Sequence, residues 1–186
     1  MSVSGRFLTV LVIGLVLLLP TQAFAEVGIQ LRVPYQGSTS DGKLASGASG
    51  TGVLIFFALD STTSVGLLSE QISFTEKNIG STADLTSNYN VNAIRISKNI
   101  TDPTASGIDQ YFAAVDIGNG QNAVANAPLA DIVLGVHMMG TKGKMTSFFG
   151  GELMYRLFNP GKTMVAGGGA TNYGGVGLCI SAGFAF

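Results

Sequence analysis

Two segments near the ends of this chain alternate strictly between apolar and other residues. Successive side chains of a β-strand point to opposite faces, so a period of two over 27–35 and over 176–186 predicts strands with one apolar face. The second face of the last segment carries mostly Gly, Ser, Cys and Ala, which suit a narrow interior where opposing walls meet. The apolar faces are Val27, Ile29, Leu31, Val33 and Tyr35 in the first segment and Val176, Leu178, Ile180, Ala182, Phe184 and Phe186 in the last.

Further strand-like runs between these segments bring the expected number of strands to eight. In two of them the alternation changes phase, near Leu67-Leu68 and near Ala93-Ile94, and a β-bulge at each point would explain the change. The region 120–130 is rich in Ala and Asn and is open to a short helical turn within a loop. The additional runs are 51–60, 63–76, 88–100, 107–117, 129–140 and 144–158.

The chain is too apolar for an ordinary soluble domain. Charged residues make up 11% of it, against roughly 25% in typical soluble domains. Beyond the N-terminal region, no stretch is long and apolar enough for a membrane-spanning helix. A closed β-barrel can also span lipid, because its backbone polar groups all pair between strands. The fold class predicted is therefore an all-β, antiparallel, up-and-down transmembrane β-barrel of eight strands.

The expected connections alternate in length along the chain. Transmembrane barrels have long loops on the extracellular side and short turns on the periplasmic side, so this alternation places both chain ends at the periplasmic side. The long connections are 36–50, 77–87, 118–128 and 159–174, and the short ones are 61–62, 101–106 and 141–144.

The first residues have the three parts of a secretory signal. Arg6 precedes an apolar run of about a dozen residues, and Ala23-Phe24-Ala25 provides the small-x-small cleavage site. The apolar run is too short to span a bilayer about 30 Å thick, which disfavours the alternative of an uncleaved anchor. We expect residues 1–25 to be a cleaved signal peptide and residues 26–186 to form the barrel domain.

The signal, the strand pattern and the terminus Gly183-Phe184-Ala185-Phe186 resemble the small eight-stranded outer-membrane barrels, the group of outer membrane protein A and outer membrane protein X. Members of this group end in an aromatic residue that the barrel-assembly machinery reads. The resemblance implies that Phe184 and Phe186 form such an assembly signal, and that the protein lies in the outer membrane of a Gram-negative cell envelope among lipid and lipopolysaccharide. The absence of Trp departs from the aromatic girdles usual in these barrels.

A set of polar residues shares the parity that faces the barrel interior. Charges inside a narrow barrel must pair, because burying an unpaired charge costs several kcal/mol. The sequence therefore predicts a structural polar network, with a gated ion path as the functional alternative. Cys179 has the same parity and is interpreted as a small filler. The predicted network comprises Arg32, Asp116, Asp131, His137, Glu152 and Arg156.

His137 is the single histidine and the natural candidate for catalysis. Some small barrels are lipid A hydrolases with a serine two residues after the histidine and a glutamate in the following strand. Glu152 has the required place here, but Met139 stands where the serine would be, and Ser147 is a poor substitute by position. No catalytic residue, cofactor or metal site is predicted, since one His and one Cys cannot build a transition-metal cluster.

The expected role is structural, in envelope integrity or in surface interaction through the long loops, which could meet an extracellular ligand. The alternatives are a small porin-like channel, a lipid A-modifying enzyme and a soluble secreted barrel of the lipocalin type. A net charge of -1 gives no electrostatic footprint for nucleic acid.

Overall fold

A computed structural model provides the fold of the chain. The predicted signal peptide, residues 1–25, lies outside the residues that the structure describes. The described residues are 26–37, 45–76, 83–101, 109–142, 145–164, 166 and 168–186.

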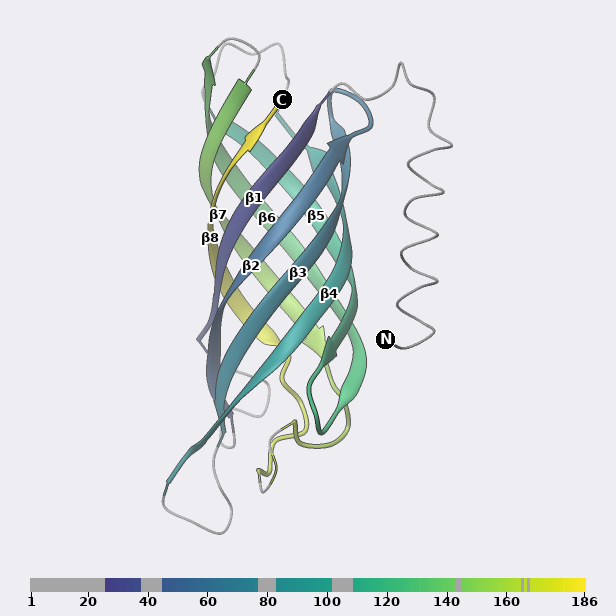
Figure 1. Ribbon diagram of the computed structural model, residues 1–186, viewed down its shortest axis with the longest axis vertical. Helices are drawn as coiled ribbons and strands as arrows, with labels where there is room; N and C mark the ends of the chain where they lie inside the picture. Colours follow the sequence, from purple (N-terminus) through teal and green to yellow (C-terminus); the bar gives the residue numbers. More distant parts are fainter. Residues whose placement is uncertain are drawn as a thin grey trace.

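Eight antiparallel strands form a closed barrel in which each strand pairs with its neighbours in sequence (Figure 1). The barrel closes between the first and last strands, where the backbone amides of Val27 and Phe186 each donate to the other's carbonyl oxygen at 3.0 Å. Both ends of the barrel domain therefore lie at one rim. The predicted fold class is confirmed. The strands are β1 (Val27–Gln36), β2 (Ala45–Ala58), β3 (Thr63–Glu76), β4 (Leu85–Asn99), β5 (Asp109–Gln121), β6 (Asn126–Lys142), β7 (Met145–Phe158) and β8 (Gly175–Ala185).

Several strands are longer at the rim away from the termini than the sequence pattern indicated. The predicted long loop 118–128 is wrong, because β5 and β6 continue to a connection of only 122–125. The helical turn suggested within 120–130 is also wrong for the same reason. The polar residues that resembled a loop, such as Asn119 and Asn126, lie on the outer face of these extended strands. Connection length therefore does not alternate strictly, since 122–125 is no longer than 59–62 at the terminal rim.

The two predicted bulges are also wrong, and the actual cause of the phase change is a reversal of the apolar face. The pairing of β3 with β4 runs without interruption from Thr63 to Glu76, and that of β4 with β5 is equally regular. On β3 the apolar residues face outward up to Leu67 and inward from Leu68 onward. The register shift between β2 and β3 lies instead at Ala45/Ala48.

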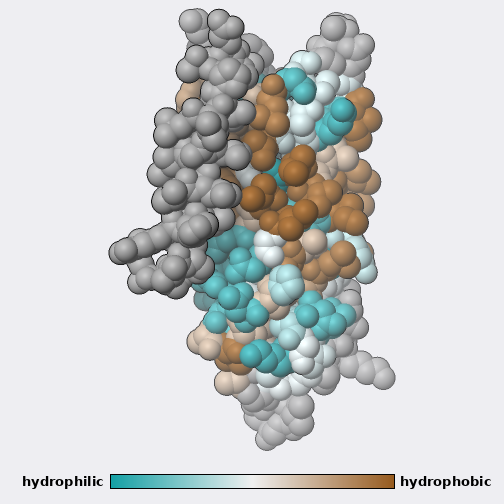
Figure 2. All heavy atoms as spheres, turned by 90° about the vertical axis from the view of Figure 1, so that its right-hand side faces the viewer, coloured by the Kyte–Doolittle hydropathy of each residue, from teal (hydrophilic) through white to brown (hydrophobic). Residues whose placement is uncertain are grey.

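A band of apolar side chains surrounds the half of the barrel nearer the termini. Leu178 and Ile180 are each 58% exposed, although both are large and apolar. Figure 2 shows apolar side chains gathered over the upper part of the face that it displays, with polar side chains below them. No helix in the described part of the chain is long and apolar enough to cross a membrane. The apolar band consists of outward side chains that include Leu31, Val53, Ile94, Ile117, Ile132, Leu153, Leu178 and Ile180.

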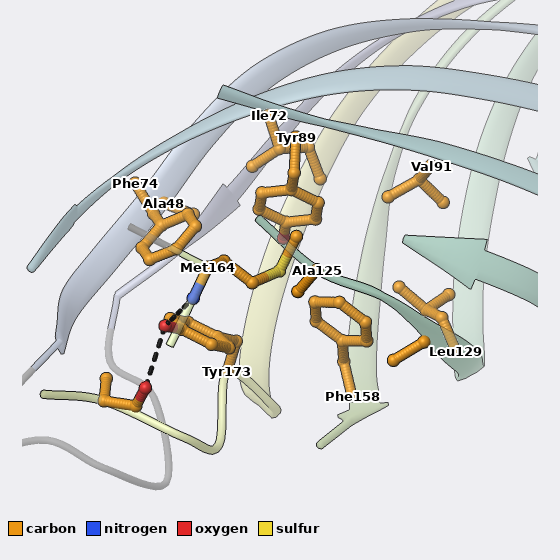
Figure 3. Packing of buried hydrophobic residues seen from close by; sticks show 12 residues of the cluster. Ala48, Ile72, Phe74, Tyr89, Val91, Ala125, Leu129, Phe158, Met164 and Tyr173 are labelled. Atoms are coloured by element: carbon orange, nitrogen blue, oxygen red, sulfur yellow. Dashed lines mark hydrogen bonds between the residues drawn. The ribbon is translucent and has the colours of Figure 1, made fainter. Parts of the chain in front are cut away.

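At the other rim the interior holds a core like that of a soluble protein. Phe74 packs edge-on against Tyr173 with ring centroids 4.5 Å apart, and Tyr89 stacks on Phe158 at 5.6 Å (Figure 3). Met164, from the connection after β7, enters the same cluster and is fully buried. Aromatic and aliphatic packing therefore fills this end of the lumen.

Candidate functional site in the barrel lumen

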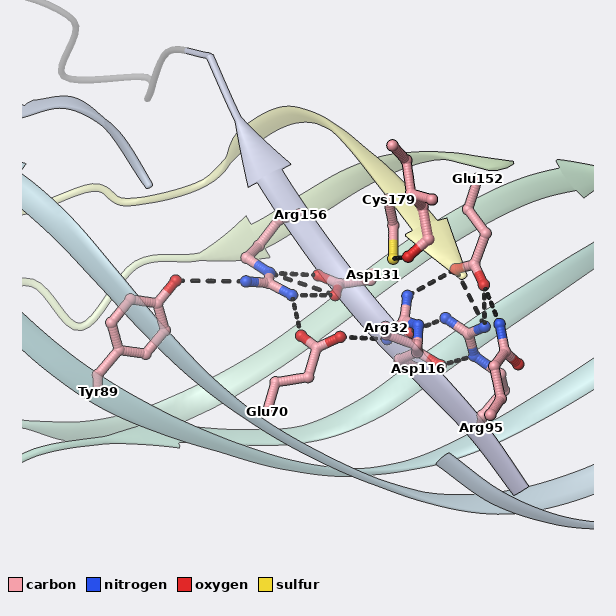
Figure 4. Close-up of polar contacts among 11 residues, drawn as sticks. Arg32, Glu70, Tyr89, Arg95, Asp116, Asp131, Glu152, Arg156 and Cys179 are labelled. Atoms are coloured by element: carbon pink, nitrogen blue, oxygen red, sulfur yellow. Dashed lines mark hydrogen bonds and ion pairs between the residues drawn. The ribbon is translucent and has the colours of Figure 1, made fainter. Parts of the chain in front are cut away.

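Between the two rims, seven charged side chains meet across the lumen in one layer. The contacts form a sequence of alternating charge: Asp131, Arg156, Glu70, Arg32, Glu152, Arg95 and Asp116 (Figure 4). The two ends of this sequence, Asp116 and Asp131, are register partners on β5 and β6, so its two acidic ends lie side by side. We call these seven residues the charge ring.

The contacts within the charge ring are short and partly bidentate. Arg95 donates from Nε and Nη2 to the two carboxylate oxygens of Asp116 at 2.7 and 2.8 Å. Arg156 binds Asp131 in the same way, with Nη2–Oδ2 at 2.6 Å. The fork of a guanidinium matches the two oxygens of a carboxylate, and this geometry gives the strongest form of ion pair. The side chains of all seven residues are at most 2% exposed.

Central members of the charge ring bind more than one partner. Glu152 accepts from Arg32 Nη2 at 2.6 Å, from Arg95 Nη1 at 3.1 Å and from Gln30 Nε2 at 2.8 Å. Glu70 bridges Arg32 and Arg156. Among the described residues, Arg32 Nε is the single buried side-chain nitrogen or oxygen without a hydrogen-bond partner. The high cost of burying charge is therefore offset by an almost complete set of partners.

Strand register places several of these residues side by side. Arg95 is the register partner of Asp116, and Asp131 that of Arg156. Gly52 lies on β2 between Arg32 and Glu70, and a Cβ atom at this position would collide with the Glu70 side chain. The absence of a side chain at Gly52 thus allows Arg32 and Glu70 to meet across an intervening strand.

The structure places five of the six predicted network residues in the charge ring and one outside it. His137 lies nearer the terminal rim, half-buried between Phe112 and Phe148, with ring centroids 4.6 and 4.7 Å away. Sequence reasoning missed Glu70 and Arg95, which complete the ring. Both lie in the strands where the apolar face reverses, so the phase of the pattern there was misread. The five residues brought together are Arg32, Asp116, Asp131, Glu152 and Arg156.

On the terminal side of the charge ring the lumen opens into a cavity of about 300 Å³. Phe56, Phe112 and Phe148 line its walls, and Arg95 and His137 also contribute to its lining. Arg95 is held in place by Asp116 and Glu152, which do not themselves line the cavity. The cavity is therefore an aromatic-walled vestibule that ends at the charge ring.

The residues considered for catalysis do not form a hydrolytic site in the described structure. Ser147 is exposed on the outer face and donates to the carbonyl oxygen of Gly140 at 3.1 Å, so it points away from His137. The hydroxyl of Ser181 lies 3.5 Å from His137 Nε2, but Ser181 is only 2% exposed and does not line the vestibule. Cys179 is buried among Phe112, Val133 and Met154, as a small filler would be. Within the described residues, no group of His, Cys, Asp or Glu is arranged to hold a metal ion.

A second buried carboxylate, Glu76, anchors the connection between β7 and β8. Glu76 is completely buried and accepts hydrogen bonds from the Ala170 amide at 2.6 Å, the Tyr173 hydroxyl at 3.0 Å and the Thr163 hydroxyl at 2.9 Å. A Cβ atom at Gly168 would collide with this carboxylate. Burial raises the pKa of Tyr173 to about 12, so its hydroxyl stays protonated and can donate throughout the physiological range. These contacts hold the connection 159–174 over the core of Figure 3.

We expect Tyr173→Phe to loosen this connection without unfolding the barrel. The hydroxyl also accepts from the Met164 amide at 2.6 Å, so its loss leaves buried donors and acceptors unpaired, at a local cost of about 1–3 kcal/mol. Hydrogen exchange of 159–174 should accelerate, whereas exchange in the strands should not. Tyr155→Phe, at a hydroxyl on the exposed outer face of β7, is the matched control. Unchanged exchange in Tyr173→Phe would show that the anchor does not depend on this hydroxyl.

Raising the pH into the alkaline range should loosen the connection 159–174 in the same way as Tyr173→Phe. The raised pKa means that the folded protein holds the Tyr173 proton more tightly than the unfolded chain does. This contribution to stability is complete below the ordinary tyrosine pKa of 10 and is lost as the pH rises through about 12.

The two aromatic residues of the predicted assembly signal lie on the outer face at the terminal rim. Phe184 is 53% exposed and Phe186 64% exposed. Phe184 is the register partner of Ile29 on β1, at the seam where the barrel closes.

The barrel is similar to solved outer-membrane barrels. The crystal structure of the outer membrane protein OprG from Pseudomonas aeruginosa matches with a TM-score of 0.60, covering 87% of this chain and 95% of that chain at 9% sequence identity. The crystal structure of Neisserial surface protein A covers 86% of this chain and 94% of that chain at 12% identity, with a TM-score of 0.46. No family model and no curated protein matches the sequence. The likeness to OprG supports the eight-stranded barrel architecture, and sequence comparison does not support the finer resemblance to outer membrane proteins A and X.

Proposed function

We propose that this protein is an integral outer-membrane barrel with a closed lumen, which serves the cell envelope through its outer surface and loops. The observation that carries the proposal is the combination of an apolar outer band with a sealed interior. A soluble barrel of the lipocalin type would turn its apolar face inward around a ligand. Here the middle of the barrel does the opposite, with Ile180 outside and Arg32 inside. Lipid is the environment that suits such a surface.

The charge ring argues against a channel. Ions and solutes pass through water-filled space, but the ring side chains are at most 2% exposed and bind one another across the lumen. The aromatic core and the anchored connection 159–174 lie beyond the ring. A barrel of this size leaves an interior just wide enough for side chains. The interior therefore serves to stabilise the barrel rather than to conduct.

Purified protein in planar bilayers should show no large, steady conductance. The measurement requires proof of insertion, for which a folded, heat-modifiable band in vesicles made from the same lipids is suitable. Bilayers that contain an open porin are the positive control, since they should show a large conductance under the same recording conditions. A steady conductance that scales with the number of inserted barrels would overturn the closed lumen and favour the channel alternative.

Cell fractionation tests the membrane placement separately. The protein should sediment with outer membranes and require detergent for extraction. Recovery from the soluble periplasmic fraction without detergent would contradict this placement. The proposed surroundings are outer-membrane lipid and lipopolysaccharide, with Phe184 and Phe186 as the signal for barrel assembly and the loops as the contact surface for any extracellular ligand.

A further inference from the structure

Beyond the apolar band, the outer face of β3–β5 carries uncharged hydrogen-bonding side chains. Gln71, Asn90 and Gln121 are register partners across β3, β4 and β5 and form one row. Ser69, Asn92 and Asn119 form the row that borders the apolar band. None of these six positions carries a charge. We call the two rows the amide face, and Figure 2 shows polar side chains below the apolar band on the side of the barrel that it displays.

A groove of about 460 Å³ lies where the amide face meets the apolar band. Val53, Ile94 and Ile117 line it on the side of the band. Asn92 and Asn119 line it on the side of the amide face. The groove thus combines aliphatic surface with amide groups in one site. This combination is complementary to an amphiphile, which has an apolar part and a polar part.

Part of the amide face has free hydrogen-bonding capacity. Asn119 donates to Asn126 at 3.1 Å, and Ser69 donates to Asn92 at 3.3 Å. Within the described residues, the exposed side chains of Gln71 and Asn90 make no hydrogen bond to protein. Each amide offers both donors and an acceptor, as a sugar hydroxyl does. The row that borders the apolar band, with Asn92 and Asn119, is therefore held by hydrogen bonds to protein. In the other row, Gln71 and Asn90 are available to a ligand.

We propose that the groove and the amide face together bind one glycolipid, with an acyl chain against Val53 and Ile94 and uncharged sugar units on Gln71 and Asn90. This inference rests on the proposed membrane placement. The lack of charge selects the ligand, because a phosphate headgroup is normally met by Arg or Lys. Neutral sugars need only the donors and acceptors that the amides supply. The apolar band and the amide face are continuous, so one molecule can cover both.

The test measures which lipids stay with the purified protein. The full chain is inserted into vesicles of phosphatidylcholine with equal amounts of diglucosyl diacylglycerol and phosphatidylglycerol that carry the same acyl chains. Native mass spectrometry after extraction then counts the retained lipids. Wild type should retain the glycolipid in preference to phosphatidylglycerol, and Gln71→Ala with Asn90→Ala should reduce this preference about tenfold through the loss of hydrogen bonds. Val53→Trp should fill the groove and reduce retention of both lipids.

Matched variants and a folding control separate the outcomes. Ser147→Ala removes an exposed hydroxyl at the opposite rim. Val176→Trp places the same ring on the outer face of β8, which does not border the strands of the groove, so both variants should behave as wild type. Equal retention of the two lipids by correctly inserted wild type would overturn the glycolipid site alone, as would an unchanged preference in the amide variant. Preferred retention of phosphatidylglycerol would identify a phospholipid site instead and also overturn the proposal. Failure of wild type to insert would overturn the membrane placement and this site together.

Discussion

Replacing Arg156 by methionine should destabilise the barrel by about 3–5 kcal/mol, the usual cost of removing one partner from a buried ion pair. Arg156 binds Asp131 through two nitrogens, reaches Glu70 at 3.2 Å and donates to the Tyr89 hydroxyl at 3.3 Å. Methionine fills part of the volume but leaves the Asp131 carboxylate without a cation. Unfolding by urea in vesicles, followed by the heat-modifiable gel shift, measures the loss.

Two further variants show whether the loss comes from unpaired charge. Lys98→Met removes a cation from an exposed outward position on β4 and should change stability by less than about 0.5 kcal/mol. Asp131→Leu added to Arg156→Met removes the stranded carboxylate and should recover much of the lost stability, because apolar replacement of a whole buried pair is often nearly neutral. If the double variant were less stable than Arg156→Met alone, the charge ring would be stabilised by something other than pairing.

The sequence pattern predicted the fold class and the interior charges wherever strands stay within the apolar band. On β1 and β8 the apolar residues face outward along the whole strand, so parity alone assigned Arg32 to the lumen. The same reasoning gave Asp116 and Glu152 an inward parity, and both side chains are buried. Parity could not show that His137 lies apart from these charges, since it gives the face of a residue but not its level along the barrel axis.

The misread parts share one physical cause. In the proposed membrane placement, water replaces lipid outside the barrel where β3 and β4 leave the apolar band, and the barrel then needs an ordinary core inside. The apolar residues therefore change from the outer face, with Leu67 and Ile94, to the inner face, with Ile72 and Val91. A reversal of this kind resembles a one-residue slip in a periodic pattern. Glu70 and Arg95 can be assigned to the lumen from the sequence if the parity of each strand is kept constant and the polarity of its two faces is allowed to change along the strand.

The contacts of Glu76 with the connection 159–174 could not be predicted from the sequence, for a different reason. Its donors come from Thr163, Ala170 and Tyr173, which lie in an irregular connection with no period to follow. A loop bonded to a distant strand end leaves no local pattern in the sequence. Only the three-dimensional path of the chain brings these groups to one carboxylate.

The reversal of polarity can be tested by placing the same charge at two outward positions. Ile180→Arg puts a cation within the apolar band and should cost about 2–4 kcal/mol of unfolding free energy, as arginine does near the middle of a bilayer. Asn90→Arg puts it on the amide face beyond the band, where water or headgroups surround it, and should change stability by less than about 0.5 kcal/mol. Urea unfolding of both variants in vesicles gives the comparison. Equal costs would mean that both positions meet the same environment, and the boundary between apolar band and amide face would then not coincide with the edge of the membrane.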